Sequence, residues 1–84
     1  MKVIDYKNYH PNMGTLIDIE NFVNYSNSHL KEAINIPYEK LLYNHSEYLD
    51  KNKKYFIVCK KGITSKKATR ILEFYGYDVT QVIK

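Results

Sequence analysis

One segment of this chain constrains the fold more than any other, because an apolar run leads through a short loop into an amphipathic pattern. The run Tyr55–Cys59 has the aromatic and β-branched residues of a buried strand. Ser65 is a suitable N-cap, and Gly76 is a suitable C-terminal stop. Between them apolar residues recur at helical spacing: Ala68, Ile71, Leu72 and Tyr75. The segment predicts a strand, a loop and a helix that begins at Ser65.

The other segments alternate between strand and helix patterns. Further strands are expected at Val3-Ile4 (a short edge strand), Thr15–Ile19, Ala33–Ile36 (stopped by Pro37) and Tyr77–Ile83. A turn or a short helical segment is expected within residues 6–13, and short helical segments are expected within residues 20–26 and 38–43. This alternation predicts one α/β domain over residues 1–84, with a mainly parallel sheet of about five strands flanked by helices.

The single cysteine limits the redox chemistry and the compartment. One cysteine in 84 residues cannot form an internal disulfide, and no secretory signal or long apolar stretch is present. We therefore expect a soluble, cytoplasmic protein in a reducing compartment, with no membrane partner. The three histidines are scattered without ligand spacing, so no metal or other cofactor is expected.

Cys59 is the candidate reactive residue. In a parallel sheet, ligands bind beyond the carboxyl ends of the strands, and Cys59 lies at such an end. The following helix directs its N-terminus at the loop, which favours thiolate over thiol and creates an anion site. The sulfur is surrounded in sequence by four lysines: Lys60, Lys61, Lys66 and Lys67.

The basic charge is concentrated around this cysteine. Residues 51–72 hold eight of the thirteen basic residues and no Asp or Glu, in a chain of net charge +4. Such a field concentrates small anions, although a solvated lysine face is the simpler interpretation of a basic run. No aromatic and basic recognition motif accompanies the charge, so no nucleic-acid partner is expected.

Four ordered landmarks resemble the single-domain rhodanese family of sulfurtransferases, over about Leu16 to Val82. They are the strand Leu16–Ile19, then His29-Leu30 with Ala33–Pro37, then Ile57–Cys59 with Gly62 and Ser65, and finally Ala68, Leu72 and Gly76–Val79. The resemblance implies the rhodanese-like fold and a thiosulfate sulfurtransferase type of activity. Cys59 would take a sulfane sulfur from a small anion such as thiosulfate and pass it to a thiol or protein acceptor.

The resemblance also assigns the substrate-binding loop. The backbone amides of residues 60–65 would stabilise the anionic sulfur, which makes the expected site Cys59 with Lys60, Lys61, Gly62, Ile63, Thr64 and Ser65. The six residues from Cys59 to Thr64 match the sulfurtransferase loop rather than the longer phosphatase loop. Ser65 also stands where cysteine phosphatases need an arginine, so an arsenate-reductase or phosphatase activity is the third choice.

Two substitutions and the chain's last residues depart from the family pattern. Thr64 and Glu20 stand where arginines are usual, and lysine cannot copy a bidentate guanidinium. The usual C-terminal helix is missing after Lys84, so we expect an exposed apolar patch at Val79, Val82 and Ile83 and allow a weak dimer. These departures favour the alternative function, a catalytically weak module that accepts sulfur or binds a protein.

Two polar residues outside the loop are expected to have structural roles. Asp18, at the end of an apolar strand, is predicted to hydrogen-bond loop amides or a nearby side chain. His29 is predicted to fix its loop through a hydrogen bond rather than to bind a metal. Tyr55 and Tyr75 are interpreted as aromatics at the border of the core.

Overall fold

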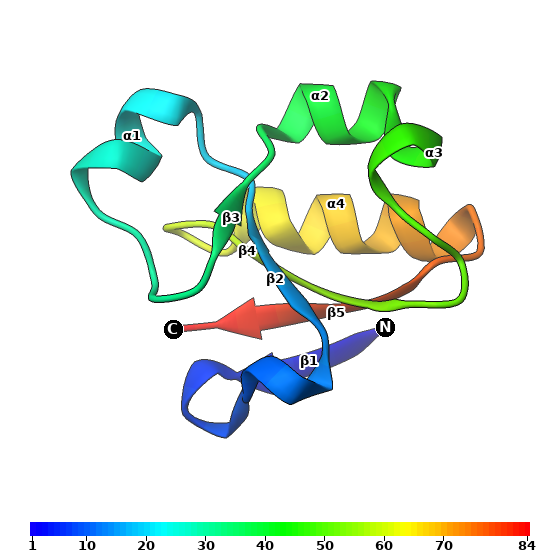
Figure 1. Ribbon diagram of the computed structural model, residues 1–84, viewed down its shortest axis with the longest axis horizontal. Coiled ribbons are helices and arrows are strands. Elements are labelled where there is room, and N and C mark those ends of the chain that lie inside the picture. Colours follow the sequence, from blue (N-terminus) through cyan, green and yellow to red (C-terminus); the bar gives the residue numbers. More distant parts are fainter.

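Segments far apart in the sequence form one parallel sheet in the computed structural model, which describes residues 1–84 (Figure 1). All four pairs of neighbouring strands are parallel. In sheet order the strands are β1 (Lys2–Asp5), β5 (Asp78–Ile83), β4 (Lys54–Val58), β2 (Thr15–Asp18) and β3 (Ile34–Asn35). The predicted α/β fold with a parallel sheet of about five strands is confirmed.

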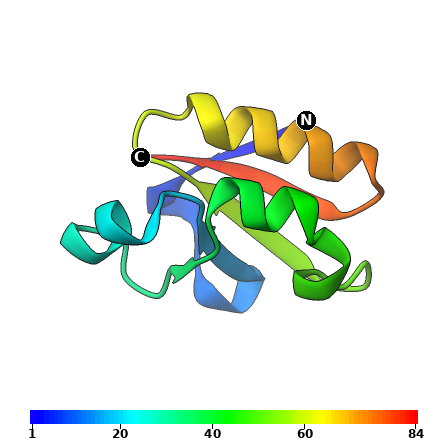
Figure 2. The same cartoon turned by 90° about the horizontal axis from the view of Figure 1, so that it is seen from above.

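Helices connect the strands on both sides of the sheet. The 3-10 turns are η1 (Tyr6–Asn8) and η2 (Pro11–Met13), and the α-helices are α1 (Phe22–Asn27), α2 (Tyr38–Tyr43), α3 (His45–Tyr48) and α4 (Ile63–Phe74). Figure 2 shows α2 and α4 over the same side of the sheet, where they contact each other.

The central strand β4 directs alternate side chains into two cores. Ile57, with Cys59 just beyond the strand, packs with the core under α2 and α4, which includes the fully buried Leu72. Phe56 and Val58 pack with the second core on the opposite face. Complete burial of one such aliphatic side chain stabilises the fold by about 1.5–3 kcal/mol. The alternation explains why the sequence from Tyr55 to Cys59 is apolar at every position.

The burial of two valines corrects the prediction of an exposed patch at the last strand. Val79, in the first core, and Val82, in the second core, are each only 1% exposed, whereas Ile83 is half-exposed. Tyr9, between the two 3-10 turns, belongs to the same core as Val82 and packs edge-on against Phe56. The segment from β1 to β2 therefore covers the face that was expected to be open.

Several element boundaries also differ from the sequence expectation. The main helix begins at Ile63 and its N-cap is Gly62, so the prediction of Ser65 as the N-cap is wrong. The strand expected over Ala33–Ile36 is only the two residues of β3, and α3 was not predicted. Tyr75 is 47% exposed, whereas Tyr55 is buried in the first core.

Candidate functional site

Cys59 lies at the carboxyl edge of the sheet, directly after β4, and is 5% exposed. Its sulfur accepts hydrogen bonds from the backbone amides of Gly62 and Ser65, both at 3.2 Å. Ser65 is in the first turn of α4, where amide groups have no partner inside the helix. We refer to residues 59–65 as the sulfur loop. Its two amides and the positive end of α4 suit a negatively charged sulfur.

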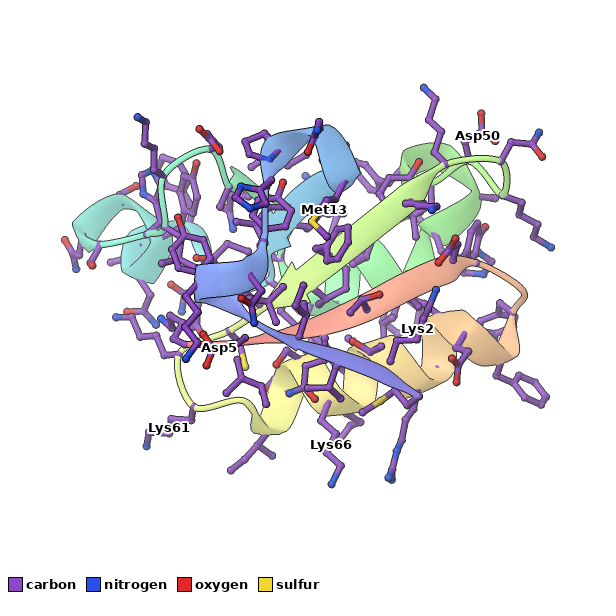
Figure 3. All side chains as sticks on the ribbon, turned by 90° about the horizontal axis from the view of Figure 1, so that it is seen from below. Lys2, Asp5, Met13, Asp50, Lys61 and Lys66 are labelled. Atoms are coloured by element: carbon purple, nitrogen blue, oxygen red, sulfur yellow. The ribbon has the colours of Figure 1, made fainter.

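The lysine side chains around the sulfur loop face solvent. Lys60, Lys61, Lys66 and Lys67 are all exposed, and none of them takes part in an ion pair. Figure 3 shows Lys61 pointing outward from the loop, so its charge acts at a distance rather than as a ligand of the sulfur. The lysines therefore contribute a positive field at the mouth of the site.

Gly62 gives the sulfur loop its turn into α4. Its backbone is left-handed, with φ 82° and ψ −14°, a conformation that is costly for residues with a Cβ atom. A Cβ atom built there would lie 3.7 Å from Gln81 Nε2, which is an ordinary contact distance. Backbone conformation, rather than space, is therefore the reason for glycine at this position.

Gln81, which was not identified from the sequence, holds the far side of the sulfur loop. It is 6% exposed on β5, and its Nε2 atom donates to the Gly62 carbonyl at 2.9 Å and to Ser65 Oγ at 3.0 Å. Ser65 Oγ in turn donates to the Gly62 carbonyl at 3.2 Å. The sequence signal that could have revealed Gln81 is a polar residue two positions after the buried Val79, on the same face of the strand.

Glu20 binds the sulfur loop at Lys60, the residue directly after the cysteine. Its Oε2 atom accepts a hydrogen bond from the Lys60 amide at 3.0 Å, across forty residues of sequence. The carboxylate therefore uses an amide that the sequence analysis assigned to the anionic sulfur. It also adds negative charge at the position where the resemblance led us to expect an arginine.

The remaining residues of the sulfur loop have less defined roles. Of the amides of residues 60–65, those of Gly62 and Ser65 bond the Cys59 sulfur, and the cradle of all six around an anionic sulfur stays a prediction. The amides of Lys61, Ile63 and Thr64 donate no hydrogen bond within the chain. They are free to bind an incoming anion. The Ile63 side chain is 70% exposed.

Asp18 stabilises the end of the neighbouring strand, as predicted. Its Oδ1 atom accepts a hydrogen bond from the Glu20 amide at 2.9 Å. Burial of the carboxyl group raises the pKa of Asp18, and the charge of Glu20 raises it further, whereas that hydrogen bond and the charges of Lys84 and His29 oppose the rise. The carboxyl group is 5% exposed and bonds backbone, which fits a structural role.

His29 occupies a separate position on the loop after α1. Its Nδ1 atom is 2.7 Å from the Tyr25 carbonyl, and its ring stacks on the Tyr25 ring with centroids 3.9 Å apart. The predicted loop-fixing hydrogen bond is confirmed. No group of three or more His, Cys, Asp and Glu side chains is placed to hold a metal ion.

A small cavity lies at the cysteine, and we name it the sulfur cavity. Its volume is about 100 Å³. It is lined by Cys59, Lys60, Lys61, Gly62, Val82, Ile83 and Lys84. This space exceeds what one water molecule needs, so a group larger than water can lie next to the sulfur.

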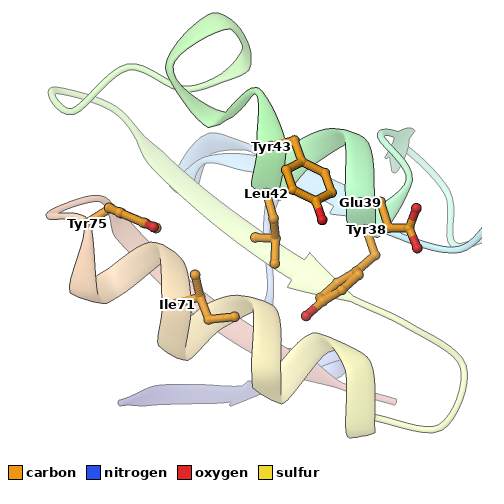
Figure 4. A pocket seen from close by; sticks show the side chains of 6 residues that line it. All are labelled: Tyr38, Glu39, Leu42, Tyr43, Ile71 and Tyr75. Carbon is orange, nitrogen blue, oxygen red and sulfur yellow. The ribbon is translucent and has the colours of Figure 1, made fainter.

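A larger pocket lies between α2 and α4 and contains no nucleophile. Figure 4 shows Tyr38 and Leu42 of α2 facing Ile71 of α4. Its volume is about 370 Å³, and it is lined mainly by apolar and aromatic side chains. Cys59 does not line it, so the chemistry belongs to the sulfur cavity.

No helix in the structure is long and apolar enough to cross a membrane.

Comparison with solved structures finds the same fold in several proteins. A rhodanese-like domain protein from Staphylococcus aureus is 25% identical with a TM-score of 0.82, and the match covers 98% of this chain and 84% of that one. A rhodanese-related protein from Thermoplasma volcanium is 24% identical with a TM-score of 0.82, covering 98% and 83% of the two chains. Reduced CoADR-RHD from Bacillus anthracis is 27% identical with a TM-score of 0.84, covering 96% of this chain and 15% of that chain.

Of the two sequence comparisons, only the one with family profiles identifies the family. A search of curated protein sequences found no match to this chain. The family profile described as the rhodanese-like domain matches residues 4–84, which include every element from β2 onward and the whole sulfur loop. The chain therefore belongs to the rhodanese-like domain family.

Proposed function

We propose that the protein is a sulfurtransferase that carries a sulfane sulfur as a persulfide on Cys59. The observation that carries this proposal is the pair of backbone amides, from Gly62 and Ser65, that point at the Cys59 sulfur at 3.2 Å. Amides fixed in this way stabilise negative charge on a sulfur atom without reorganisation during the reaction. The family and the free cysteine support the same assignment.

The loading step uses a small sulfur-containing anion, with thiosulfate as the simplest donor. The Cys59 thiolate attacks the outer sulfur of thiosulfate, the S–S bond to the sulfonate sulfur breaks, and sulfite leaves with the electron pair. The product is a Cys59 persulfide anion. The free amides of Lys61, Ile63 and Thr64 are suitable donors to the sulfonate oxygens, and the lysines favour arrival of the dianion.

The unloading step needs a thiophilic acceptor. Cyanide, a small thiol or a protein thiol attacks the outer sulfur of the persulfide, and Cys59 leaves as a thiolate that the Gly62 and Ser65 amides stabilise. No metal or redox cofactor takes part in either step, because the sulfur atom moves with no external electron carrier.

The alternative is a catalytically weak module that accepts sulfur from, or binds, a dedicated protein. Glu20 favours it, because its carboxylate occupies the Lys60 amide and repels an anionic donor. Thr64, in place of an arginine, also favours it. Under this alternative Cys59 is still loaded, but slowly by thiosulfate and rapidly by a persulfide donor.

Intact mass spectrometry after incubation with thiosulfate tests both functions. The proposed function requires that the protein gain the mass of one sulfur atom, that cyanide remove it with formation of thiocyanate, and that Cys59→Ser gain nothing. Loading by a polysulfide donor but not by thiosulfate would favour the alternative. A wild-type protein that no donor loads would overturn the sulfurtransferase assignment.

A further inference from the structure

A shallow groove runs from the sulfur cavity across the surface beside α4, and we name it the docking groove. Its volume is about 620 Å³. It is lined by Met1, Val3, Lys61, Gly62, Ile63, Lys66, Gln81 and Ile83. Lys61, Gly62 and Ile83 also line the sulfur cavity, so the two spaces are adjacent. A molecule in the docking groove would lie against the mouth of the cysteine site.

The docking groove is larger than a small sulfur donor requires. The sulfur cavity, at about 100 Å³, already accommodates a small anion. The groove adds apolar surface beyond it, with Val3 47%, Ile63 70% and Ile83 49% exposed. Exposed apolar side chains grouped around a reactive residue are typical of a surface that contacts a larger partner.

The rim of the docking groove is basic. Lys61 and Lys66 line it without forming ion pairs, and Figure 3 shows both pointing outward on the same side of the molecule. A second shallow groove, of about 420 Å³, shares Ile63 and Lys66 and adds Lys67 and Arg70. No Asp or Glu lines either groove or the sulfur cavity. A complementary partner therefore carries negative charge next to apolar groups.

We infer that the docking groove binds an acidic, partly apolar polypeptide segment whose cysteine thiol accepts the sulfur from Cys59. This inference rests on the proposed function. The charge of the rim selects acidic side chains, and the exposed Ile63 and Ile83 select apolar ones. No aromatic side chain lines the groove, and the stacking that single-stranded nucleic acid requires is therefore absent.

The transfer step balances without another reactant. The thiolate of the bound segment attacks the outer sulfur of the Cys59 persulfide and forms a new S–S bond. The bond between that outer sulfur and Cys59 Sγ breaks, and its electron pair stays on Cys59. The segment becomes the persulfide, and Cys59 returns to the thiolate with no net oxidation or reduction.

Two synthetic peptides of equal length test the inference on the loaded protein. Each has one cysteine next to leucine, and the flanking residues are glutamate in one peptide and lysine in the other. The rate of sulfur transfer to each is followed by mass spectrometry. We expect the acidic peptide to react about tenfold faster than the basic one at low salt, and added salt should reduce the difference.

A matched pair of lysine variants locates the effect. Lys66→Glu reverses one charge at the groove and should lower the ratio of acidic to basic peptide rates by about tenfold. Lys53→Glu makes the same charge change in the exposed turn before β4, at the amino end of the strand, and should keep the wild-type ratio. Equal rates for the two peptides, or the same ratio in both variants, would overturn the inference and leave the sulfurtransferase function standing.

Two further measurements cover the remaining outcomes. If no donor loads Cys59, the proposed function fails, and the groove is tested by titrating the unloaded protein with the two peptides in which serine replaces cysteine. Preferential binding of the acidic one, lost in Lys66→Glu, would support the docking groove on its own. Tighter binding of a single-stranded oligothymidine than of the acidic peptide would overturn the inference in favour of a nucleic-acid surface.

Discussion

The ends of β4 and β2 lie side by side in the sheet, and at both ends a side-chain acceptor receives hydrogen bonds from backbone amides. After β4, the amides of the sulfur loop point at the Cys59 sulfur. After β2, the Asp18 carboxylate accepts the amide of Glu20, two residues further along. Hydrogen bonds from backbone amides thus hold the cysteine sulfur at the β4 end and a carboxylate at the β2 end.

One hydrogen bond joins the two strand ends, and through it the Glu20 carboxylate competes with any bound anion for the Lys60 amide. The Glu20 carboxylate reaches from the β2 end to the Lys60 amide in the sulfur loop. The bond orders the loop but removes one amide, and adds one negative charge, where an anionic donor would bind. If the sulfur loop binds an anionic donor as proposed, Glu20 both orders the loop and opposes that binding, and variants can separate these two effects.

The largest effect is expected from Gly62→Val, which changes the conformation of the sulfur loop at the end of β4. Valine is strongly disfavoured at φ 82°, at a cost of about 1–3 kcal/mol if the backbone stays, so the loop should rearrange and lose its amide contacts to the sulfur. We expect persulfide loading to fall by about a hundredfold or more with the far-ultraviolet circular dichroism intact.

Gly62→Asn is the matched control, because asparagine tolerates the left-handed conformation far better than valine does. It should keep most of the loading rate. Equal losses in the two variants would mean that the conformation of Gly62 is not what organises the sulfur loop.

The next effect is expected from Gln81→Leu, which removes the support behind the sulfur loop. The Gly62 carbonyl keeps bonds from Ser65 Oγ and the Lys66 amide, but it loses its side-chain donor from β5. We expect the free energy of unfolding in urea to fall by about 1–3 kcal/mol and loading at saturating donor to slow by about tenfold.

Thr80→Val is the control for Gln81→Leu, since Thr80 is the adjacent buried residue of β5 and its side chain alternates to the other face. It should change stability without changing loading. If Gln81→Leu also changed stability alone, Gln81 would be a packing residue and not a positioning residue for the loop.

A smaller effect, and in the opposite direction, is expected from Glu20→Gln. The neutral amide can keep a hydrogen bond to Lys60 but removes the negative charge from the anion site. Loading by thiosulfate should become about three- to tenfold faster, mainly through tighter donor binding. The exposed Glu47→Gln, on α3, makes the same charge change far from the loop and should have no effect. Slower loading in Glu20→Gln would show that ordering of the loop outweighs charge.

The parts of the site that could be predicted from the sequence are the local ones. The run from Tyr55 to Cys59 and the helix after it follow from periodicity, because neighbouring residues alone determine them. Ser65 was misassigned as the N-cap because a serine before a helical pattern usually caps it, whereas the left-handed Gly62 starts α4 two residues earlier than expected. The helix α3 has only four residues and lacks any repeat of the helical period.

The parts that were missed depend on contacts between distant segments. Gln81 meets the sulfur loop only because β5 lies beside β4, and Glu20 meets it only because β2 lies on the other side of β4. The burial of Val82 depends on Tyr9, more than seventy residues away in sequence. A pattern within one segment cannot reveal such contacts, which is why Val79 and Val82 were wrongly expected in an exposed patch, although Ile83 is exposed as expected.

The smallest effect is expected from Asp18→Asn, which tests whether ionisation of the buried Asp18 side chain lowers the free energy of unfolding. Burial raises the pKa of Asp18 above 3.8, so the folded protein binds this proton more readily than the unfolded one. The free energy of unfolding of the wild type should then fall as the pH rises through the interval from 3.8 to the raised pKa, and it should stay lower above that interval.

In the Asp18→Asn variant, asparagine keeps the Oδ1 acceptor for the Glu20 amide and does not titrate. The difference in stability, variant minus wild type, should therefore increase from about pH 3 to about pH 7. Urea unfolding of both proteins at each pH measures this difference, and any fixed cost of the new amide group cancels in it. A difference that decreases over the same interval would mean that the amide bond, Lys84 and His29 stabilise the charge more than burial opposes it, so that both strand ends would be favourable anion sites.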